Sequence, residues 1–495
     1  MIKQHETIAF NFKGGIISPG YLHNILEITE QMQVSQVRFG SRQQLYVEVP
    51  IKLLAEFTHV CHQKRIHFSL EESNEQNIIS SYAANGIFIN ESWLSEGVYK
   101  DIFDQFDFVS KFKINICDRD QTFVPFFTGH INWIASAQSH FWYLYIRLPK
   151  TNKLFCYPEL VYTNDLVYVT KTLEKLLLEQ TAFFYEDINK YGQLLHKIIK
   201  STVNPITKSI ESQLELPLFH LPYYEGFNKH GNTWWLGIYR RNELFSVSFL
   251  KDICRLCLET KIGELYATTW KSIIIKGIAT PDRNRWDYLL GKYRINVRHA
   301  ANELNWQIED NSEDGLVLKR HVIRYFDKED VRTYGLCFAV KTQSNSGIFG
   351  SVIIRRQGGK TSKLKSQERY ELLYTPGFNP NSSEYILFRN QVEKEYLGTY
   401  LVSLCKLFYE SKAEVIVAAQ PELNKPNISQ ETLVLLYQCK HCSTVYDPQT
   451  GDPTNGVIAG TDFNDLPANY ECPLCESPLE DFKVMAPLHT TLKVL

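Results

Sequence analysis

The sequence predicts an α+β protein with a duplicated body and a small metal-bound domain near its C-terminal end. Three observations support this class. Strand-like and helix-like patterns alternate through the body, one such unit recurs about 228 residues later, and four cysteines form two close pairs near the end. At 495 residues the chain is long enough for about two to four domains. Hydrophobic residues make up 44% and charged residues 22%, a balance that supports packed cores and argues against extensive disorder.

Charge and cysteine usage narrow the functional classes. The net charge of -2, from 53 basic and 55 acidic residues, gives no electrostatic basis for a nucleic-acid partner. The first residues lack a basic region followed by an apolar run, and no segment approaches the roughly 20 apolar residues that cross a bilayer. Seven of the eleven cysteines are scattered, which indicates reduced thiols rather than disulfides. We therefore expect a cytoplasmic protein without a membrane or nucleic-acid partner.

The first unit of the body reads as strand, helix, strand, strand, and this order resembles half of a ferredoxin-like fold. A helix is expected to begin at Ser18 and Pro19, because serine is a favoured N-cap and proline a favoured first helical residue. Residues 42–49 alternate as a strand. A second helix of the same pattern follows Ser246, and with one residue inserted the strand aligns with 271–278. Matching order, phase and length favour a duplication.

Domain boundaries follow from these units and from a turn-rich stretch near residue 420. The predicted parts are a first half at 1–212 with a ferredoxin-like lobe at about 1–72, a second half at 213–418 with a lobe at about 213–290, a linker at 419–433 and a small domain at 434–488. Within the second half we expect a helix over 286–304 and a strand around 315–325.

Two short motifs in the first half lie in the order found in one known family. Val37-Arg38-Phe-Gly-Ser-Arg42-Gln43 and Lys111-Phe-Lys113-Ile are similar to the Arg-x-Thr-x-Arg-Gln and Lys-Phe-Lys segments of the siroheme-dependent nitrite and sulfite reductases. These enzymes are built from a duplicated half with a ferredoxin-like lobe. The resemblance implies that four side chains bind the siroheme carboxylates: Arg38, Arg42, Lys111 and Lys113. Converging cations suit a polyanion, although each of these residues taken singly is also typical of a solvated surface.

The chain departs from that family in its cysteines. The family carries Cys-x5-Cys and Cys-x3-Cys motifs that bind a four-iron cluster, and no segment of this sequence has those spacings. Cys254 and Cys257 lie on a predicted helix, where packing is the expected role, and a lone His130 is more typical of a structural residue than of a ligand. We therefore expect no 4Fe-4S cluster. The body is either a degenerate scaffold or binds a tetrapyrrole without a cluster.

Four cysteines near the end of the chain have the spacing of a metal site. They are Cys439, Cys442, Cys472 and Cys475. Four thiolates in a tetrahedron bind zinc or iron. The inner pair encloses twenty-nine residues, more than the roughly 15 to 20 of a common zinc ribbon.

The residues between the two cysteine pairs bear on whether the site binds iron or zinc. Val445-Tyr446-Asp447-Pro448 and Gly460-Thr461-Asp462-Phe463 resemble rubredoxin, and the resemblance extends from about residue 437 to 482. It implies one mononuclear iron that cycles between the ferric and ferrous states. Since all four ligand positions are cysteine, no position is open for substrate, which favours electron transfer over catalysis. Zinc remains the alternative metal.

Three positions depart from the rubredoxin pattern. Ser443 and Glu476 stand where the family usually has glycine, and Tyr470 stands where it usually has tryptophan. A non-glycine residue in a turn with positive φ costs roughly 1 kcal/mol. Residues 437–483 include eight acidic residues and two lysines, which gives this segment a net charge of -6. The rest of the chain therefore carries a net charge of +4. This acidic domain could dock on its own body or on a basic redox partner.

The leading hypothesis is a one-electron transfer protein: a rubredoxin iron fused to a degenerate nitrite or sulfite reductase-like body, with a protein redox donor and acceptor. The resemblance suggests nitrite or sulfite assimilation as the pathway. Two alternatives remain open: a siroheme-binding reductase component that receives electrons from the iron, and a zinc-stabilised interaction protein.

Overall fold

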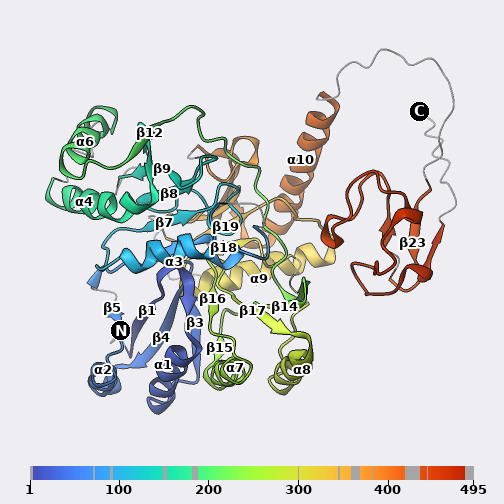
Figure 1. The fold of residues 1–495 in the computed structure, drawn as a ribbon, viewed down its shortest axis with the longest axis horizontal. Helices are drawn as coiled ribbons and strands as arrows, with labels where there is room; N and C mark the ends of the chain where they lie inside the picture. Colours follow the sequence, from blue (N-terminus) through green and yellow to red (C-terminus); the bar gives the residue numbers. More distant parts are fainter. Residues whose placement is uncertain are drawn as a thin grey trace. The chain divides into compact units, whose positions relative to one another are not determined.

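The structure is a computed structural model that divides into two compact units, Met1–Ala413 and Glu414–Leu495. It describes residues 4–484 with these gaps: 71–72, 90–92, 149–152, 181–187, 299, 301, 344–345, 358–367, 383, 419–434 and 443. The first unit mixes helices with several sheets and confirms the predicted α+β class (Figure 1). In the described part of the chain, no helix has both the length and the apolar character needed to cross a bilayer.

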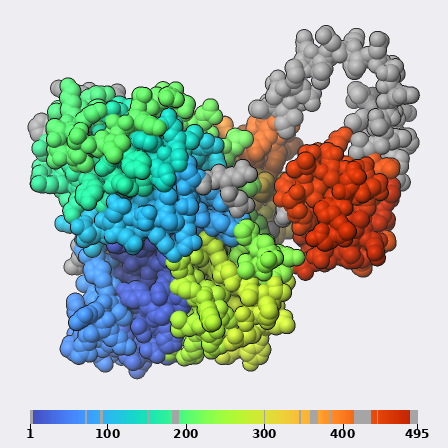
Figure 2. Space-filling model, viewed as in Figure 1, coloured from blue at the N-terminus to red at the C-terminus, as the bar shows by residue number. Residues whose placement is uncertain are grey.

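Two similar lobes form one end of the body, and their surfaces adjoin in Figure 2. Helices α1 and α7 pack side by side beneath the two sheets (Figure 1). The first sheet has the order β15-β3-β4-β1-β5, and the second has the order β13-β14-β17-β16-β2. The first-lobe elements are β1 His5–Asn11, β2 Ile16–Ile17, α1 Pro19–Gln31, β3 Gln36–Phe39, β4 Gln44–Pro50, α2 Leu54–Gln63 and β5 Ser69–Leu70. Those of the second lobe are β13 Gly226–His230, β14 Thr233–Ile238, β15 Phe245–Ser246, α7 Val247–Glu259, β16 Leu265–Ala267, β17 Ile273–Ala279 and α8 Arg283–Lys292.

The lobes exchange strands. Strand β2, from the first half, pairs with β16 at the edge of the second sheet, and β15, from the second half, pairs with β3 at the edge of the first. Each sheet is therefore completed by the other half of the chain. This reciprocal arrangement confirms that the body is duplicated.

The backbone also fixes the alignment of the two halves. Gln43 and Lys271 both have positive φ, at 60° and 55°, and both occupy the same turn between two antiparallel strands. They lie 228 residues apart, as do Ser18 and Ser246. The predicted alignment, which placed Arg42 opposite Lys271, is therefore wrong by one residue.

The one residue that the second half has in addition to the first lies after this turn, in β17. The pairing of β17 with β14 shifts between Trp234 and Leu236, and Gly277 at this point has a φ of 73°. A β-bulge absorbs one additional residue without disturbing the flanking strands. An alternating sequence pattern does not show where such a bulge lies, which is why the insertion was predicted before the strand.

Two further sheets carry the rest of the body. One has the order β12-β11-β9-β8-β7-β6, with β10 paired to β9, and the other has the order β18-β19-β20-β21-β22. In both, three parallel strands are followed by an antiparallel one. The strands are β6 Ile78–Ser80, β7 Ile114–Cys117, β8 Ile131–Ala135, β9 Phe141–Arg147, β10 Leu154–Cys156, β11 Glu159–Tyr162, β12 Thr207–Ser209, β18 Trp306–Ile308, β19 Phe338–Lys341, β20 Val352–Gln357, β21 Arg369–Tyr374 and β22 Ile386–Glu393. The helices are α3 Glu96–Gln105, α4 Leu166–Glu179, α6 Ile188–Thr202, α9 Glu313–Lys328 and α10 Leu397–Ala418.

Two predicted elements in the second half are wrong. The segment 315–325, expected as a strand, lies within α9, whose N-terminus is capped by the Ser312 hydroxyl accepting from the Gly315 N–H at 3.2 Å. Its apolar run resembles a strand locally, but the buried positions follow a helical period. The helix expected over 286–304 ends at Lys292, because Arg294 adopts a positive φ of 55°.

The second unit is a small aromatic-cored domain. Its sheet has the order β24-β23-β25, formed by β23 Tyr437–Cys439, β24 Val445–Tyr446 and β25 Phe482–Val484. The rings of Tyr437 and Phe463 stack with centroids 3.9 Å apart. All the aromatics expected in this core are buried: Tyr437, Tyr446, Phe463, Tyr470 and Phe482. The predicted linker 419–433 lies outside the described residues.

Candidate functional site

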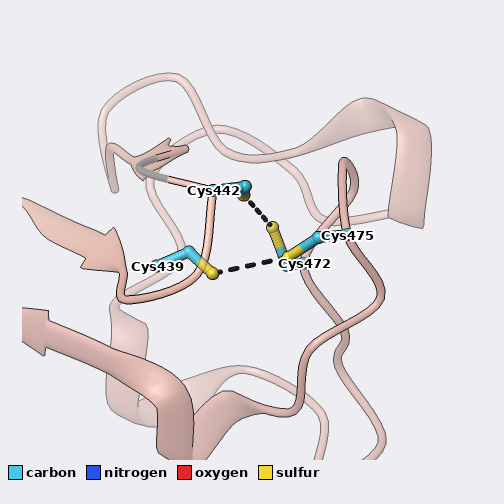
Figure 3. A group of neighbouring side chains, drawn as sticks. All are labelled: Cys439, Cys442, Cys472 and Cys475. Atoms are coloured by element: carbon cyan, nitrogen blue, oxygen red, sulfur yellow. Dashed lines mark hydrogen bonds between the residues drawn. The ribbon is translucent and has the colours of Figure 1, made fainter.

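The four predicted ligand cysteines converge in the small domain. Their sulfur atoms all lie within 4.8 Å of one another and point toward a common centre (Figure 3). The Sγ atoms of Cys439 and Cys475 are 3.6 Å apart, and those of Cys442 and Cys472 are 3.4 Å apart. Sulfurs bound at about 2.3 Å to one tetrahedral metal ion stand about 3.8 Å apart. The donor set and its spacing therefore fit a single iron or zinc ion.

Each cysteine pair sits on a loop closed by the same backbone hydrogen bond. The Cys439 N–H donates to the Thr444 carbonyl at 2.8 Å, and the Cys472 N–H donates to the Ser477 carbonyl at 2.8 Å. The two loops thus present their sulfurs in equivalent ways, with the first cysteine of each pair buried and the second more accessible.

Two of the predicted departures from the rubredoxin pattern can be placed. Glu476 has a positive φ of 59°, as expected for a residue that replaces glycine in this turn. Tyr470 is buried, and its hydroxyl donates to Asp452 at 2.8 Å. Ser443 lies outside the described residues.

Sequence reasoning missed two hydroxyl groups beside the cysteines. Thr444 Oγ1 lies 3.0 Å from Cys442 Sγ, and Ser477 Oγ lies 3.1 Å from Cys475 Sγ. The Thr444 hydroxyl is the main reason that the pKa of Cys442 is lowered to about 6, whereas burial raises the pKa of Cys472 to about 12. A pattern of Cys-x-x-Cys-x-Ser/Thr at both pairs was the available signal.

The body contains a polar cavity of about 680 Å³. Its wall combines residues of the first lobe with segments that follow β7, β18 and β19. Of the four cations predicted to bind siroheme, Arg42 and Lys113 line this cavity. A cavity of this size is large enough for a small organic ligand.

Arg42 is buried at the cavity wall, but most of its guanidinium is used by the protein. It donates to Asn115 Oδ1 at 2.7 Å and to the carbonyls of Asn77 and Ile114 at 2.7 and 2.8 Å. Burial lowers the pKa of Arg42 to about 9. Its Nε has no hydrogen-bond partner in the described structure. Arg42 therefore holds the first lobe against β7 and offers one remaining donor.

Lys113 is the other predicted cation at this cavity. Burial, followed by the charges of Arg42 and Arg147, lowers its pKa. The Lys113 backbone N–H donates to His130 Nδ1 at 3.1 Å, and burial together with these cations lowers the pKa of His130 to about 3. His130 is therefore a neutral residue that holds the backbone, in agreement with its expected structural role.

The other two predicted cations lie elsewhere. Arg38 contacts the Asn242 carbonyl at 3.5 Å and lies 3.8 Å from Glu313, beside a different, smaller pocket. The Lys111 side chain is exposed. The structure thus brings two of the four cations to the cavity and leaves the other two outside it.

Carboxylates also line the cavity: Glu75, Glu309 and Asp310. Glu309 accepts from the N–H groups of Thr342 and Gln343 at 3.0 and 2.9 Å. Asp310 accepts from the Ser41 N–H at 3.0 Å and pairs with Lys271 at 3.3 Å. Glu309 and Asp310 thus stabilise the loops that follow β18 and β19, and with Glu75 they make the cavity wall mixed in charge rather than uniformly basic.

Two tryptophans stand at the corresponding positions of the second half. With the offset of 228 residues, Arg42 corresponds to Trp270 and Thr7 to Trp235, and both tryptophans are buried in the same hydrophobic core. Thr7 and Arg42 line the cavity in the first half. The equivalent positions therefore carry polar residues that line the cavity in the first half and buried indole rings in the second, where Trp235 also lines a separate pocket of about 230 Å³.

Comparisons with known proteins match the two units of the chain separately. The first match is between structures and covers most of the chain. The structure resembles that of the NirA protein of Mycobacterium tuberculosis, with a TM-score of 0.64 over 84% of each chain at 12% sequence identity. At this identity the similarity shows the fold alone. It confirms the reductase-like fold expected for the body.

The second unit matches by sequence. Residues 436–482 match the family model for rubredoxin. The chain is 47% identical over 47 residues to the high molecular weight rubredoxin of Moorella thermoacetica, 44% identical over 50 residues to a rubredoxin of Cupriavidus necator and 41% identical over 46 residues to Rubredoxin-2 of Chlorobaculum tepidum. These matches cover 9–10% of this chain and 20%, 64% and 88% of the three relatives. Through this segment the chain belongs to the rubredoxin family.

Proposed function

We propose that this protein is a one-electron carrier whose redox centre is a single iron bound by the four cysteines. The observation that carries this proposal is the convergence of four sulfur atoms within 4.8 Å in a domain of the rubredoxin family. When bound there, iron supplies a ferric/ferrous couple. Because four cysteines complete the coordination, the site has no place for substrate, which supports electron transfer rather than catalysis.

The exposure of the cysteines supports exchange of electrons at the domain surface. Cys442 is half-buried and Cys475 is exposed, whereas Cys439 and Cys472 are buried. A redox partner can therefore approach one side of the centre without displacing a ligand. The net charge of -6 on the domain favours a donor or acceptor with a basic surface, and salt would weaken that attraction.

The cellular setting extends the proposal. We place the protein in the cytoplasm, where reduced thiols persist, because its scattered cysteines are free in the structure. The short motifs around Arg42 and Lys113 suggest nitrite or sulfite assimilation as the pathway. The unidentified donor and acceptor would then be proteins of that pathway.

The visible spectrum of protein purified from its native host tests the iron. We expect a red protein that bleaches when dithionite is added and regains its colour in air. The variant Cys472→Ser should lose or alter the spectrum, whereas Cys156→Ser, at an exposed cysteine of the body, should not. A colourless wild-type protein that contains zinc would contradict the electron-carrier function.

A second candidate function rests on the cavity of the body. Its wall includes Lys113 and three buried polar atoms without a partner in the described structure: Arg42 Nε, Gln44 Oε1 and Ser346 Oγ. Such atoms favour a polar ligand, because an unpaired buried polar group is costly. On a NirA-like fold, this supports a component that binds siroheme and receives electrons from the iron. The three carboxylates in the wall count against a polyanionic ligand.

Extraction of cofactor from the same native preparation separates the two candidates. A stoichiometric tetrapyrrole in the acidic organic extract would support the second candidate, and Lys113→Met should then lower its content while leaving the iron content unchanged. A tetrapyrrole-free extract from a protein that retains its iron would support the carrier alone.

A further inference from the structure

The two cysteine loops share a feature that the rubredoxin match does not describe. In each loop, the residue two positions after the second cysteine carries a hydroxyl beside that cysteine's sulfur. The distances are 3.0 Å from Thr444 Oγ1 to Cys442 Sγ and 3.1 Å from Ser477 Oγ to Cys475 Sγ. The two contacts are related by the same repeat that relates the backbone hydrogen bonds of the two loops.

In the described part of the domain, neither hydroxyl has a hydrogen-bond partner other than sulfur. The backbone carbonyls of both residues already accept the N–H groups of Cys439 and Cys472. In the described part of the domain, the cysteine sulfur is the side-chain partner of each hydroxyl. A thiolate that binds a metal has no proton to give, so the hydroxyl must be the donor in both contacts.

The accessible ligands are the ones that receive these bonds. Cys442 is half-buried and Cys475 is exposed, and each has a hydroxyl, whereas no hydroxyl contact is found for the buried sulfurs of Cys439 and Cys472 in the described structure. The hydroxyls therefore act where the centre meets solvent and a redox partner.

From this geometry we infer that Thr444 and Ser477 set the reduction potential of the centre by donating hydroxyl hydrogen bonds to Cys442 and Cys475. The inference rests on the proposed iron function. In the iron-loaded site, one electron from an external one-electron donor would reduce ferric to ferrous iron, and no bond would be made or broken. The sulfurs then carry more negative charge and accept hydrogen bonds more strongly. The hydroxyls thus stabilise the reduced form and raise the potential.

Potentiometry on the full chain reconstituted with iron tests the inference, whichever metal the native host supplies. Thr444→Val and Ser477→Ala each remove one hydroxyl with little change in volume. We expect each to lower the equilibrium constant for reduction about fivefold and the double variant to lower it ~25-fold. At 59 mV per tenfold change for one electron, the potential falls by about 40 mV and about 80 mV.

Two controls separate the hydroxyl effect from a general disturbance. Thr444→Ser restores a hydroxyl and should recover the wild-type potential. Thr450→Val removes a hydroxyl that donates to the Asp447 carbonyl at 3.1 Å, and it should leave the potential unchanged. The sulfur-to-iron charge-transfer bands of Thr444→Val and Ser477→Ala should move to longer wavelength, because sulfur without a hydrogen bond is a better electron donor.

Iron-loaded variants that keep the wild-type potential and bands would overturn this inference and leave the carrier function standing. A full chain that takes up no iron on reconstitution would overturn the carrier function and this inference with it.

Discussion

At the residue scale, the two predicted cofactor-binding cations that line the cavity, Arg42 and Lys113, have different roles. Arg42 uses most of its guanidinium to join the lobe to β7, and Lys113 faces the cavity with a lowered pKa. The sequence motifs predicted four cations as one group. They could not show that Arg38 and Lys111 would lie elsewhere, since that depends on how the strands after the motif are placed in space.

His130 gives a prediction at this scale. Its pKa falls from the ordinary 6.5 to about 3 because of burial and the neighbouring cations, so below pH 6.5 the unfolded chain binds a proton that the folded chain excludes. The stability that neutral His130 contributes is complete above pH 6.5 and is lost as the pH falls toward 3. From pH 7 to pH 5 the free energy of unfolding should fall by about 2 kcal/mol more in the wild type than in His130→Gln.

Urea unfolding followed at several pH values measures this difference. Between pH 7 and pH 8 the two proteins should respond equally to pH, which provides an internal control. Parallel curves from pH 7 down to pH 5 would show that His130 is not held neutral in the folded protein.

At the element scale, local patterns predicted the two equivalent helices α1 and α7 but not the exchange of strands between lobes. Ser18 and Ser246 mark the starts of α1 and α7 as expected. Strands β2 and β15 have two residues each, too short for any periodic signal, and their partners lie more than two hundred residues away. The bulge at Gly277 was equally hidden. Such features depend on tertiary pairing rather than on local sequence.

The strand exchange predicts that the two lobes are stabilised together. Phe245 in β15 is fully buried, and its ring meets that of Phe39 in the first lobe edge-on at 5.1 Å. Phe245→Ala should cost about 3 kcal/mol. Hydrogen exchange should then show faster opening in β4 of the first lobe as well as in β17 of the second. The control Tyr288→Ala removes a 75% exposed ring from α8 and should change stability by less than about 0.5 kcal/mol. Faster exchange confined to β17 would argue against joint stabilisation.

At the scale of the whole molecule, a large α+β fold and a small rubredoxin-family domain share one chain. The spacing of the four cysteines and the residues between them predicted that the four sulfurs converge, because ligand spacing is a local property. The cavity in the body could not be predicted, because its wall is formed by residues of the first lobe and of the segments after β7, β18 and β19, which only the fold brings together. The two units also differ in what stabilises them.

Metal removal should unfold one unit and not the other. The small domain has a core of a few aromatic rings around the four cysteines, and so small a core needs its metal. A chelator added under reducing conditions should abolish hydrogen-exchange protection in β23 and β25 while protection in β8 and β19 of the body persists. Retained protection in β23 after complete loss of metal would show that the domain folds without its ion.

A reductive titration of the native protein, combined with metal analysis, tests whether the four cysteines hold one redox-active iron. We expect one iron for each chain and uptake of one electron for each iron, with loss of the visible absorption in proportion to the electrons added. One zinc for each chain, with no electron uptake, would contradict this expectation.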